Sequence, residues 1–141
     1  MKRLIAAALL VLLLCGCAGE KIEANENCFL IHFRNNCGCE IYGIHLEYYL
    51  ADKPLGGGFA GYANGEAIRY DDILTRDFIP ADFPADPDLT ALRVEVYIVD
   101  GQQQEYLCPE IPELDAAWGN TYEIILTGNY ESGFHAAWRE N

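Results

Sequence analysis

The sequence predicts an all-β domain, an antiparallel two-sheet sandwich of six or seven strands that is immunoglobulin-like in the broad sense. Three observations predict it. After Cys28 the apolar residues fall into short alternating runs, turn residues separate these runs, and no long stretch has the period of a helix. The clearest run is Leu92–Val99, whose strict alternation is typical of a central strand with one buried face. A small closed barrel is the alternative architecture.

The first two strands are expected at Phe29–Arg34 and Ile41–Leu50. In both segments every second residue is large and apolar, which predicts one buried face for each strand. Residues 35–39 contain asparagine and glycine and predict a turn, so we interpret the two strands as a pair.

Two irregular strands are expected next. The three glycines that open Gly56–Tyr62 indicate an irregular strand with a bulge or a close approach. The dipeptide Asn64-Gly65 is the strongest hairpin signal in the chain, and it leads into a strand expected at Ala67–Asp71. Residues 72–90 contain three prolines and five aspartates, so we predict a long surface loop there.

The remaining elements follow the central strand. Asp100-Gly101 predicts a turn into an antiparallel partner at Gln104–Cys108. After a second long connection, the last strand is expected at Thr121–Thr127, and residues 129–141 are interpreted as a C-terminal tail.

An export signal precedes the folded part. Lys2 and Arg3 come before an apolar run that begins at Leu4 and ends at Cys17. A basic start, an apolar stretch of about ten to thirteen residues and small residues near its end are typical of a secretory signal, and the stretch is too short for a permanent membrane span. We therefore expect residues 1–16 to be removed.

The end of this signal resembles the lipobox of bacterial lipoproteins, with Leu14, Cys15 and Gly16 placed before Cys17. Lipid on Cys15 would require Leu14 directly before the cut, where a small residue is preferred, and an ordinary secreted protein is the other alternative. The resemblance implies that Cys17 becomes a diacylglyceryl-cysteine carrying acyl chains such as palmitate. Two or three chains would anchor the protein stably to the extracytoplasmic face of the cell membrane.

Length and charge limit what the exported part can be. About 125 residues remain after cleavage, which suits one domain with a core. We expect a lipidated tether at 17–27, a β-sandwich domain at 28–128, and the tail. The whole chain has a formal charge of −13, and loss of Lys2 and Arg3 makes it more acidic. This acidity opposes binding to nucleic acid and to an anionic leaflet, so the lipid must provide the membrane contact.

Turn and core signals recur in a definite order: Phe33-Arg34-Asn35-Asn36, Ile41 with Ile44, Asn64-Gly65-Glu66, Leu92-Arg93-Val94-Glu95-Val96 with Asp100-Gly101, and Gly119-Asn120-Thr121-Tyr122. This order resembles the small β-sandwich domains of uncharacterised bacterial lipoproteins, over about residues 28–128. The resemblance implies a sandwich fold and export. It implies no activity, because its motifs are turn and core signals and none of them is a catalytic or ligand-binding motif. The cysteines and the aspartate-proline loop depart from that pattern.

Four cysteines remain in the exported domain, and an even number outside the cytoplasm suggests disulfides. Cys28 and the pair Cys37 and Cys39 lie beyond opposite ends of one strand, roughly 20 Å apart, too far to bridge. Cys28 can then bond only to Cys108 or stay reduced. A Cys28–Cys108 bond would leave Cys37 and Cys39 to each other, in a tight and reducible bond. Alternatively one of that pair takes Cys108, or all four remain thiols.

These cysteines have two candidate chemical roles. Cys37-Gly38-Cys39 is a candidate redox pair, although it is not a Cys-x-x-Cys motif and no helix follows to lower a thiol pKa. His32 and His45 would share a face if their strands paired, and with Cys37 or Cys39 they are candidate zinc or copper ligands.

Two further groups are candidate binding residues. Loop carboxylates are candidate calcium ligands, namely Asp71, Asp72, Asp77, Asp82, Asp86 and Asp88. Aromatic residues are a candidate platform for a glycan or an envelope protein, namely Tyr49, Tyr62, Tyr97, Trp118, Phe134 and Trp138. Strand alternation places only Tyr49 and Tyr97 of these on the outer face.

No reaction is indicated by the sequence. The exported part has a single serine, Ser132, without the Gly-x-Ser-x-Gly context of a hydrolase nucleophile. We therefore predict no enzymatic activity and no cofactor, and a binding or structural role at the cell envelope. A metal-binding or thiol-redox envelope protein is the alternative.

Overall fold

The computed structural model describes residues 21–140, so the predicted signal peptide, the lipobox and Cys17 lie outside the described residues. Within residues 21–140, no helix has the length and apolar character needed to cross a membrane. Eight strands and two short 3₁₀ turns follow one another: β1 (Phe29–Asn35), β2 (Gly43–Leu50), β3 (Lys53–Ala60), β4 (Ile73–Phe78), η1 (Pro80–Asp82), η2 (Leu89–Ala91), β5 (Leu92–Val99), β6 (Glu105–Leu107), β7 (Thr121–Asn129) and β8 (Gly133–Trp138).

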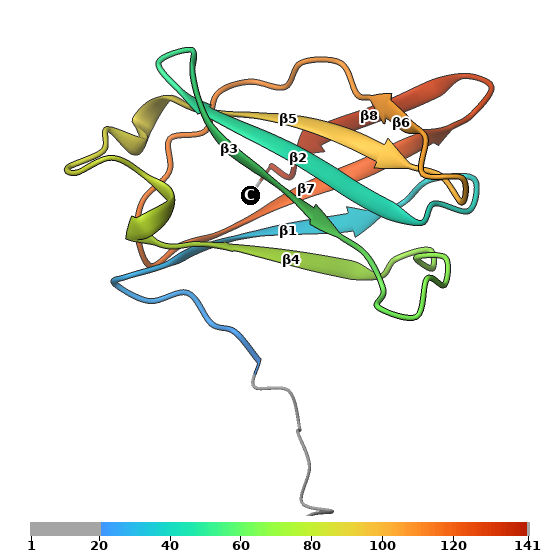
Figure 1. The fold of residues 1–141 in the computed structure, drawn as a ribbon, viewed down its shortest axis with the longest axis horizontal. Helices are drawn as coiled ribbons and strands as arrows, with labels where there is room; N and C mark the ends of the chain where they lie inside the picture. The colour runs from blue at the N-terminus through green and yellow to red at the C-terminus, as the bar shows by residue number, and fades with distance from the viewer. Residues whose placement is uncertain (1–20, 141) are drawn as a thin grey trace, which may run out of the picture.

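The strands form two four-stranded sheets that pack face to face (Figure 1). The first sheet has the order β4-β1-β7-β8, and the second has the order β3-β2-β5-β6. Every neighbouring pair is antiparallel except β1 and β7, which run parallel. The predicted all-β sandwich is therefore confirmed, with eight strands in place of six or seven.

The core consists of the alternate residues that the strands turn toward each other. On β1, Phe29, Ile31 and Phe33 are completely buried. Val94 and Val96 on β5 join the same cluster from the second sheet. The strand with the strictest alternation, β5, lies between β2 and β6, as its pattern predicts for a central strand.

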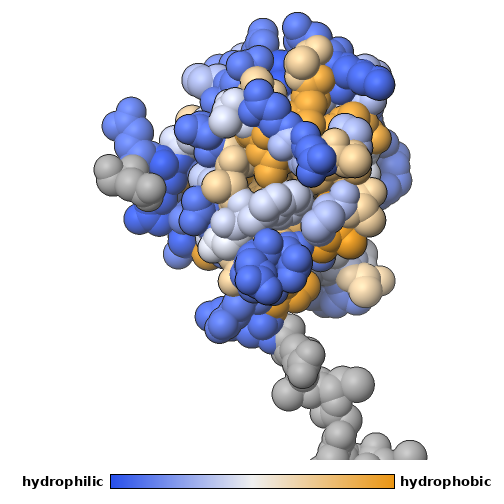
Figure 2. Space-filling model, turned by 90° about the vertical axis from the view of Figure 1, so that its left-hand side faces the viewer, coloured by the Kyte–Doolittle hydropathy of each residue, from blue (hydrophilic) through white to orange (hydrophobic). Residues whose placement is uncertain are grey.

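Aromatic rings fill one end of the core. The ring of Phe29 stacks on that of Phe78 with centroids 4.8 Å apart, and the Trp118 ring lies 5.5 Å from it. Phe83 and Leu89, which lie in the segment around η1 and η2, are also buried. Figure 2 looks onto this end of the sandwich, where apolar side chains lie inside a hydrophilic rim. Part of the predicted surface loop therefore closes the end of the core.

The predicted pairing of β1 with β2 is wrong. The two strands belong to different sheets, so residues 36–42 cross from the first sheet to the second. Buried Asn35 marks the start of this crossing. Its Nδ2 donates to the carbonyl of Ile68 (2.9 Å), and its Oδ1 accepts from the Cys37 N–H (3.0 Å). Each strand has an apolar face, and in opposite sheets these faces bury each other.

The glycine run forms β3, an edge strand paired with β2. A Cβ on Gly56 would lie 2.8 Å from the Tyr48 hydroxyl oxygen, and a Cβ on Gly57 would lie 2.8 Å from the backbone carbonyl oxygen of Leu46. The glycines thus leave room for the Tyr48 side chain and for the backbone of β2. The close approach that the sequence indicated is confirmed.

Asn64 and Gly65 form a turn, with Gly65 at φ +73°, but not the predicted hairpin. The chain returns to the first sheet instead, and the strand expected at Ala67–Asp71 is reduced to one isolated bridge at Ile68. The next regular strand is β4, which lies inside the segment that was predicted to be a loop. It pairs with β1 and turns Phe78 into the core, a pattern that the following prolines and aspartates obscured.

The C-terminal segment belongs to the sandwich. Strand β8 pairs antiparallel with β7 and forms an edge of the first sheet. Phe134 on β8 is buried, and its ring packs 5.1 Å from that of Tyr130. The domain therefore extends beyond residue 128 to Trp138, and most of the predicted tail is an edge strand with a buried inner face.

Candidate functional site

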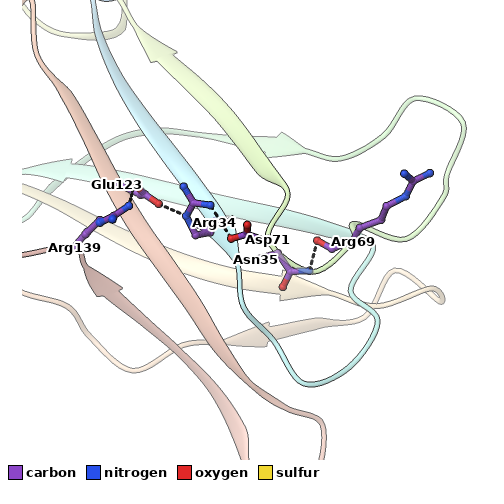
Figure 3. Close-up of polar contacts among 6 residues, drawn as sticks. All are labelled: Arg34, Asn35, Arg69, Asp71, Glu123 and Arg139. Carbon is purple, nitrogen blue, oxygen red and sulfur yellow. Dashed lines mark hydrogen bonds and ion pairs between the residues drawn. The ribbon is translucent and has the colours of Figure 1, made fainter.

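The outer face of the first sheet carries a network of ion pairs (Figure 3). Arg34 on β1 donates to Glu123 on β7 and to Asp71 in the β3–β4 connection, the latter at 2.7 Å. Glu123 also accepts from Arg139 at 3.0 Å. Burial raises the pKa of Glu123, but the hydrogen bonds from both arginines outweigh it and hold that pKa below its ordinary value. Each charge in this network has a partner, which suits a structural role.

A row of large side chains crosses all four strands on the outer face of the second sheet. His45 lies opposite Phe59 on β3 and Tyr97 on β5, and Tyr97 lies opposite Leu107 on β6. Phe59 is 59% exposed and Leu107 is 57% exposed. The rings of His45 and Tyr97 stack between them, with centroids 5.2 Å apart. These four residues are called the cross-strand row.

Two carboxylates lie next to this row. Glu47 on β2 is directly opposite Glu95 on β5. The Tyr49 hydroxyl donates to Glu47 at 2.8 Å and lies 3.2 Å from Glu95, and the bond to Glu47 is the main reason that the pKa of Tyr49 is raised to about 12. Glu95 accepts from Arg93 at 2.7 Å, which lowers the pKa of Glu95, and from the Tyr97 hydroxyl at 3.2 Å. Arg93 thus neutralises only one of the two glutamates.

A shallow trough runs between β2 and β3 beside Glu47. A Cβ on Gly57 would lie 3.5 Å from His45 Nε2 and 2.8 Å from the Leu46 carbonyl oxygen, so glycine leaves the floor of the trough bare. The trough has a volume of about 470 Å³ and is lined by His45, Glu47, Tyr49, Pro54, Leu55, Gly56 and Gly57.

The structure does not bring the two predicted metal-ligating histidines together. His32 lies on the outer face of the first sheet, where its Nδ1 is 2.7 Å from the Thr75 hydroxyl. His45 lies on the outer face of the second sheet, and Cys37 is buried after the end of β1. Within residues 21–140 no group of three His, Cys, Asp or Glu side chains is arranged to hold a metal ion. The separation follows from the placement of β1 and β2 in different sheets.

All four cysteines of residues 21–140 are free thiols, so neither predicted disulfide, Cys28–Cys108 or Cys37–Cys39, is present. Cys28 precedes β1 in the first sheet, whereas Cys108 follows β6 in the second. Burial raises the pKa of Cys37 to about 12 and that of Cys108 to about 11. Little thiolate, the reactive form, is present at such pKa values, which disfavours redox cycling at Cys37.

We expect a maleimide to modify Cys39 in the folded protein near neutral pH, because Cys39 alone among these four is partly exposed. Burial also raises the pKa of Cys39, so its reaction should be slower than that of a free thiol. Cys28, Cys37 and Cys108 should react only after unfolding in urea. Mass spectrometry of the labelled peptides measures this, and incomplete labelling of the four after unfolding would reveal a disulfide.

Four of the six candidate calcium ligands make separate local contacts. Asp88 accepts from the N–H and the hydroxyl of Thr90 at the start of η2, and Asp82 accepts from the N–H of Ile79 at the start of η1. Asp71 pairs with Arg34, and Asp72 accepts from Tyr62. These carboxylates therefore stabilise turns and crossings at different places in the fold.

The predicted outer-face positions of Tyr49 and Tyr97 are confirmed, since both lie near Glu95. Trp118 and Phe134 pack with the core instead. Sequence reasoning missed Phe59 and Leu107, because Phe59 follows three glycines and Leu107 lies in a three-residue strand. Strand alternation was the signal that could have found them. The residues next to Phe59 and Leu107 in their strands face the core, so Phe59 and Leu107 must face outward.

Comparison with known proteins gives no family. No protein-family model matches the chain, and no curated protein matches it. Among solved structures, a disulfide-locked mutant of intermedilysin with human CD59 is 11% identical, over 80% of this chain and 24% of that one, with a TM-score of 0.38. The membrane-binding domain of pneumolysin is 8% identical, over 81% of this chain and 97% of that one, with a TM-score of 0.37. Listeriolysin O is 6% identical, over 81% of this chain and 22% of that one, with a TM-score of 0.39.

This chain therefore spans about a quarter of the length of the intermedilysin chain. TM-scores below 0.5 at such low identities carry no argument about its function.

Proposed function

We propose that this chain is an exported protein, anchored by lipid on Cys17 to the extracytoplasmic face of a membrane, which binds a partner and catalyses no reaction. The binding surface is the outer face of the second sheet, comprising the cross-strand row and the trough beside Glu47. The basic start, the apolar run and the lipobox support the anchor.

One observation supports this face as the binding surface. Phe59 and Leu107 are large apolar side chains, both more than half exposed, and they lie in register with the stacked rings of His45 and Tyr97. Isolated apolar residues are common on protein surfaces, but a continuous row is typical of an interaction site. The outer face of the first sheet has its charges paired in the network around Glu123, so it is the less suitable surface.

The anchor is tested by changing Cys17 to serine. The C17S variant should leave the membrane fraction and lose incorporation of labelled palmitate, because it lacks the thiol that accepts the lipid. A C39S variant is the matched control and should remain in the membrane fraction. Retention of the C17S variant in the membrane would overturn the proposed anchor.

The binding face is tested by placing a photo-crosslinking amino acid at Phe59 or Leu107 of the full chain in the cells that make it. Both positions should give the same adduct, because they lie in one row. Thr75 and His135, on strands of the first sheet, are control positions and should give none. Adducts from all four positions, or none from Phe59 and Leu107, would contradict the proposal.

A further inference from the structure

Glu47 is an unneutralised carboxylate near the middle of the proposed binding face. Within residues 21–140, no basic side chain lies within 4.0 Å of it, and its hydrogen bond comes from the Tyr49 hydroxyl. The two other glutamates on the strands of this face have a basic neighbour. Glu95 pairs with Arg93, and Glu105 Oε1 lies 2.9 Å from His45 Nδ1, although without hydrogen-bond geometry.

Glu47 faces a second carboxylate across the sheet. It lies directly opposite Glu95, and like charges in directly opposed positions destabilise a sheet. Arg93 bonds to Glu95 and covers the ring of Tyr49 at 3.9 Å, so its charge is already engaged. A cation supplied by a partner would relieve this repulsion, and the overall charge of −13 would favour its approach.

The shape of the face favours a protein over a glycan. Sugar rings commonly stack on the open face of an aromatic ring, but Arg93 covers one face of the Tyr49 ring, and His45 and Tyr97 stack on each other. The exposed ring of Phe59 lies close to Gly43 and Gly61 at the edge of the sheet. The exposed Phe59 and Leu107 lie on the two edge strands, so the apolar surface extends across the whole sheet. A surface of this width is far larger than a metal ion would occupy. A central apolar row beside a polar group is typical of a protein interface.

We infer that the partner is a protein which lays a basic segment along the trough and places a lysine or arginine beside Glu47. This inference rests on the proposed function and adds the chemistry of the partner to it. Apolar groups of the same segment contact the cross-strand row near Phe59. The bare floor at Gly57 lets the segment approach the sheet closely.

The test uses the full lipidated chain in a nonionic detergent and a fluorescent peptide of alternating lysine and serine. Changing Glu47 to glutamine should weaken binding of this peptide by about tenfold, because a charge pair within an interface is lost. The glutamine keeps an acceptor for the Tyr49 hydroxyl, so the fold should be unaffected. The E131Q variant makes the same charge change in the exposed β7–β8 turn and should alter binding by about twofold or less.

Other outcomes separate this inference from the proposed function. A peptide with glutamate in place of lysine should not bind, and binding of the lysine peptide should weaken as salt rises. Mass spectrometry of the Phe59 adduct should identify a partner segment that contains lysine or arginine. If adducts form but E47Q and E131Q bind the lysine peptide equally, the cationic partner is refuted while the binding face stands. If no adduct forms at Phe59 or Leu107, the proposed function itself fails.

Discussion

Changing Phe29 to alanine is expected to lower the free energy of unfolding by about 3–5 kcal/mol, since large aromatic residues in a packed core cost this much to truncate. Phe29 is completely buried and contacts rings from three other segments, those of Phe78, Phe83 and Trp118. The cavity left behind would be lined by rigid rings that relax little. A loss of this size is a large fraction of the stability of a typical domain.

Urea unfolding followed by tryptophan fluorescence measures this loss, because Trp118 lies beside Phe29. The matched control is the F59A variant, which removes the same side chain from an exposed position and should cost about 0.5 kcal/mol or less. Equal losses for the two variants would contradict the assignment of Phe29 to the core.

Changing Gly128 to alanine is expected to destabilise the protein by about 2–4 kcal/mol, from backbone strain together with a steric clash. Gly128 on β7 has φ +101°, which disfavours any residue with a Cβ. A Cβ there would overlap the carbonyl oxygen of Gly133 and lie 3.0 Å from Phe134 Cα. Edge strand β8 would have to move away from β7.

The G133A variant separates strain from clash. Gly133 also has positive φ, +87°, but nothing lies within 4 Å of a Cβ built there. Its replacement should therefore cost only the conformational term, about 1–2 kcal/mol. Urea midpoints of the two variants give the comparison, and a G133A loss as large as that of G128A would argue against the clash.

Local signals predicted the hairpin of β5 and β6 correctly. These strands are adjacent in the chain, and the turn between them has its own chemistry, since Asp100 Oδ1 accepts from the N–H groups of Gln102 and Gln104. The outer-face positions of Tyr49 and Tyr97 were also predictable, because strand alternation alone decides them.

Long-range pairing was not predictable in the same way. The parallel contact of β1 with β7 joins segments about ninety residues apart, and nothing local marks either strand for the other. The same limit applies to the candidate site. Glu47 and Glu95 meet only because β2 and β5 are neighbours, and the trough exists only because the Gly57 edge lies beside them.

The sequence by itself determined the all-β class, the residues that face inward on β1, β2, β5 and β7, and the residue types that make the turns. The export signal and the lipid on Cys17 remain predictions from the sequence. Only the tertiary structure decided which strands are neighbours, placed His32 and His45 on opposite faces, and brought Glu47 next to Glu95 and the trough. The reason is physical: a period of two residues determines which side of a strand is buried, whereas backbone hydrogen bonds are alike for every partner strand.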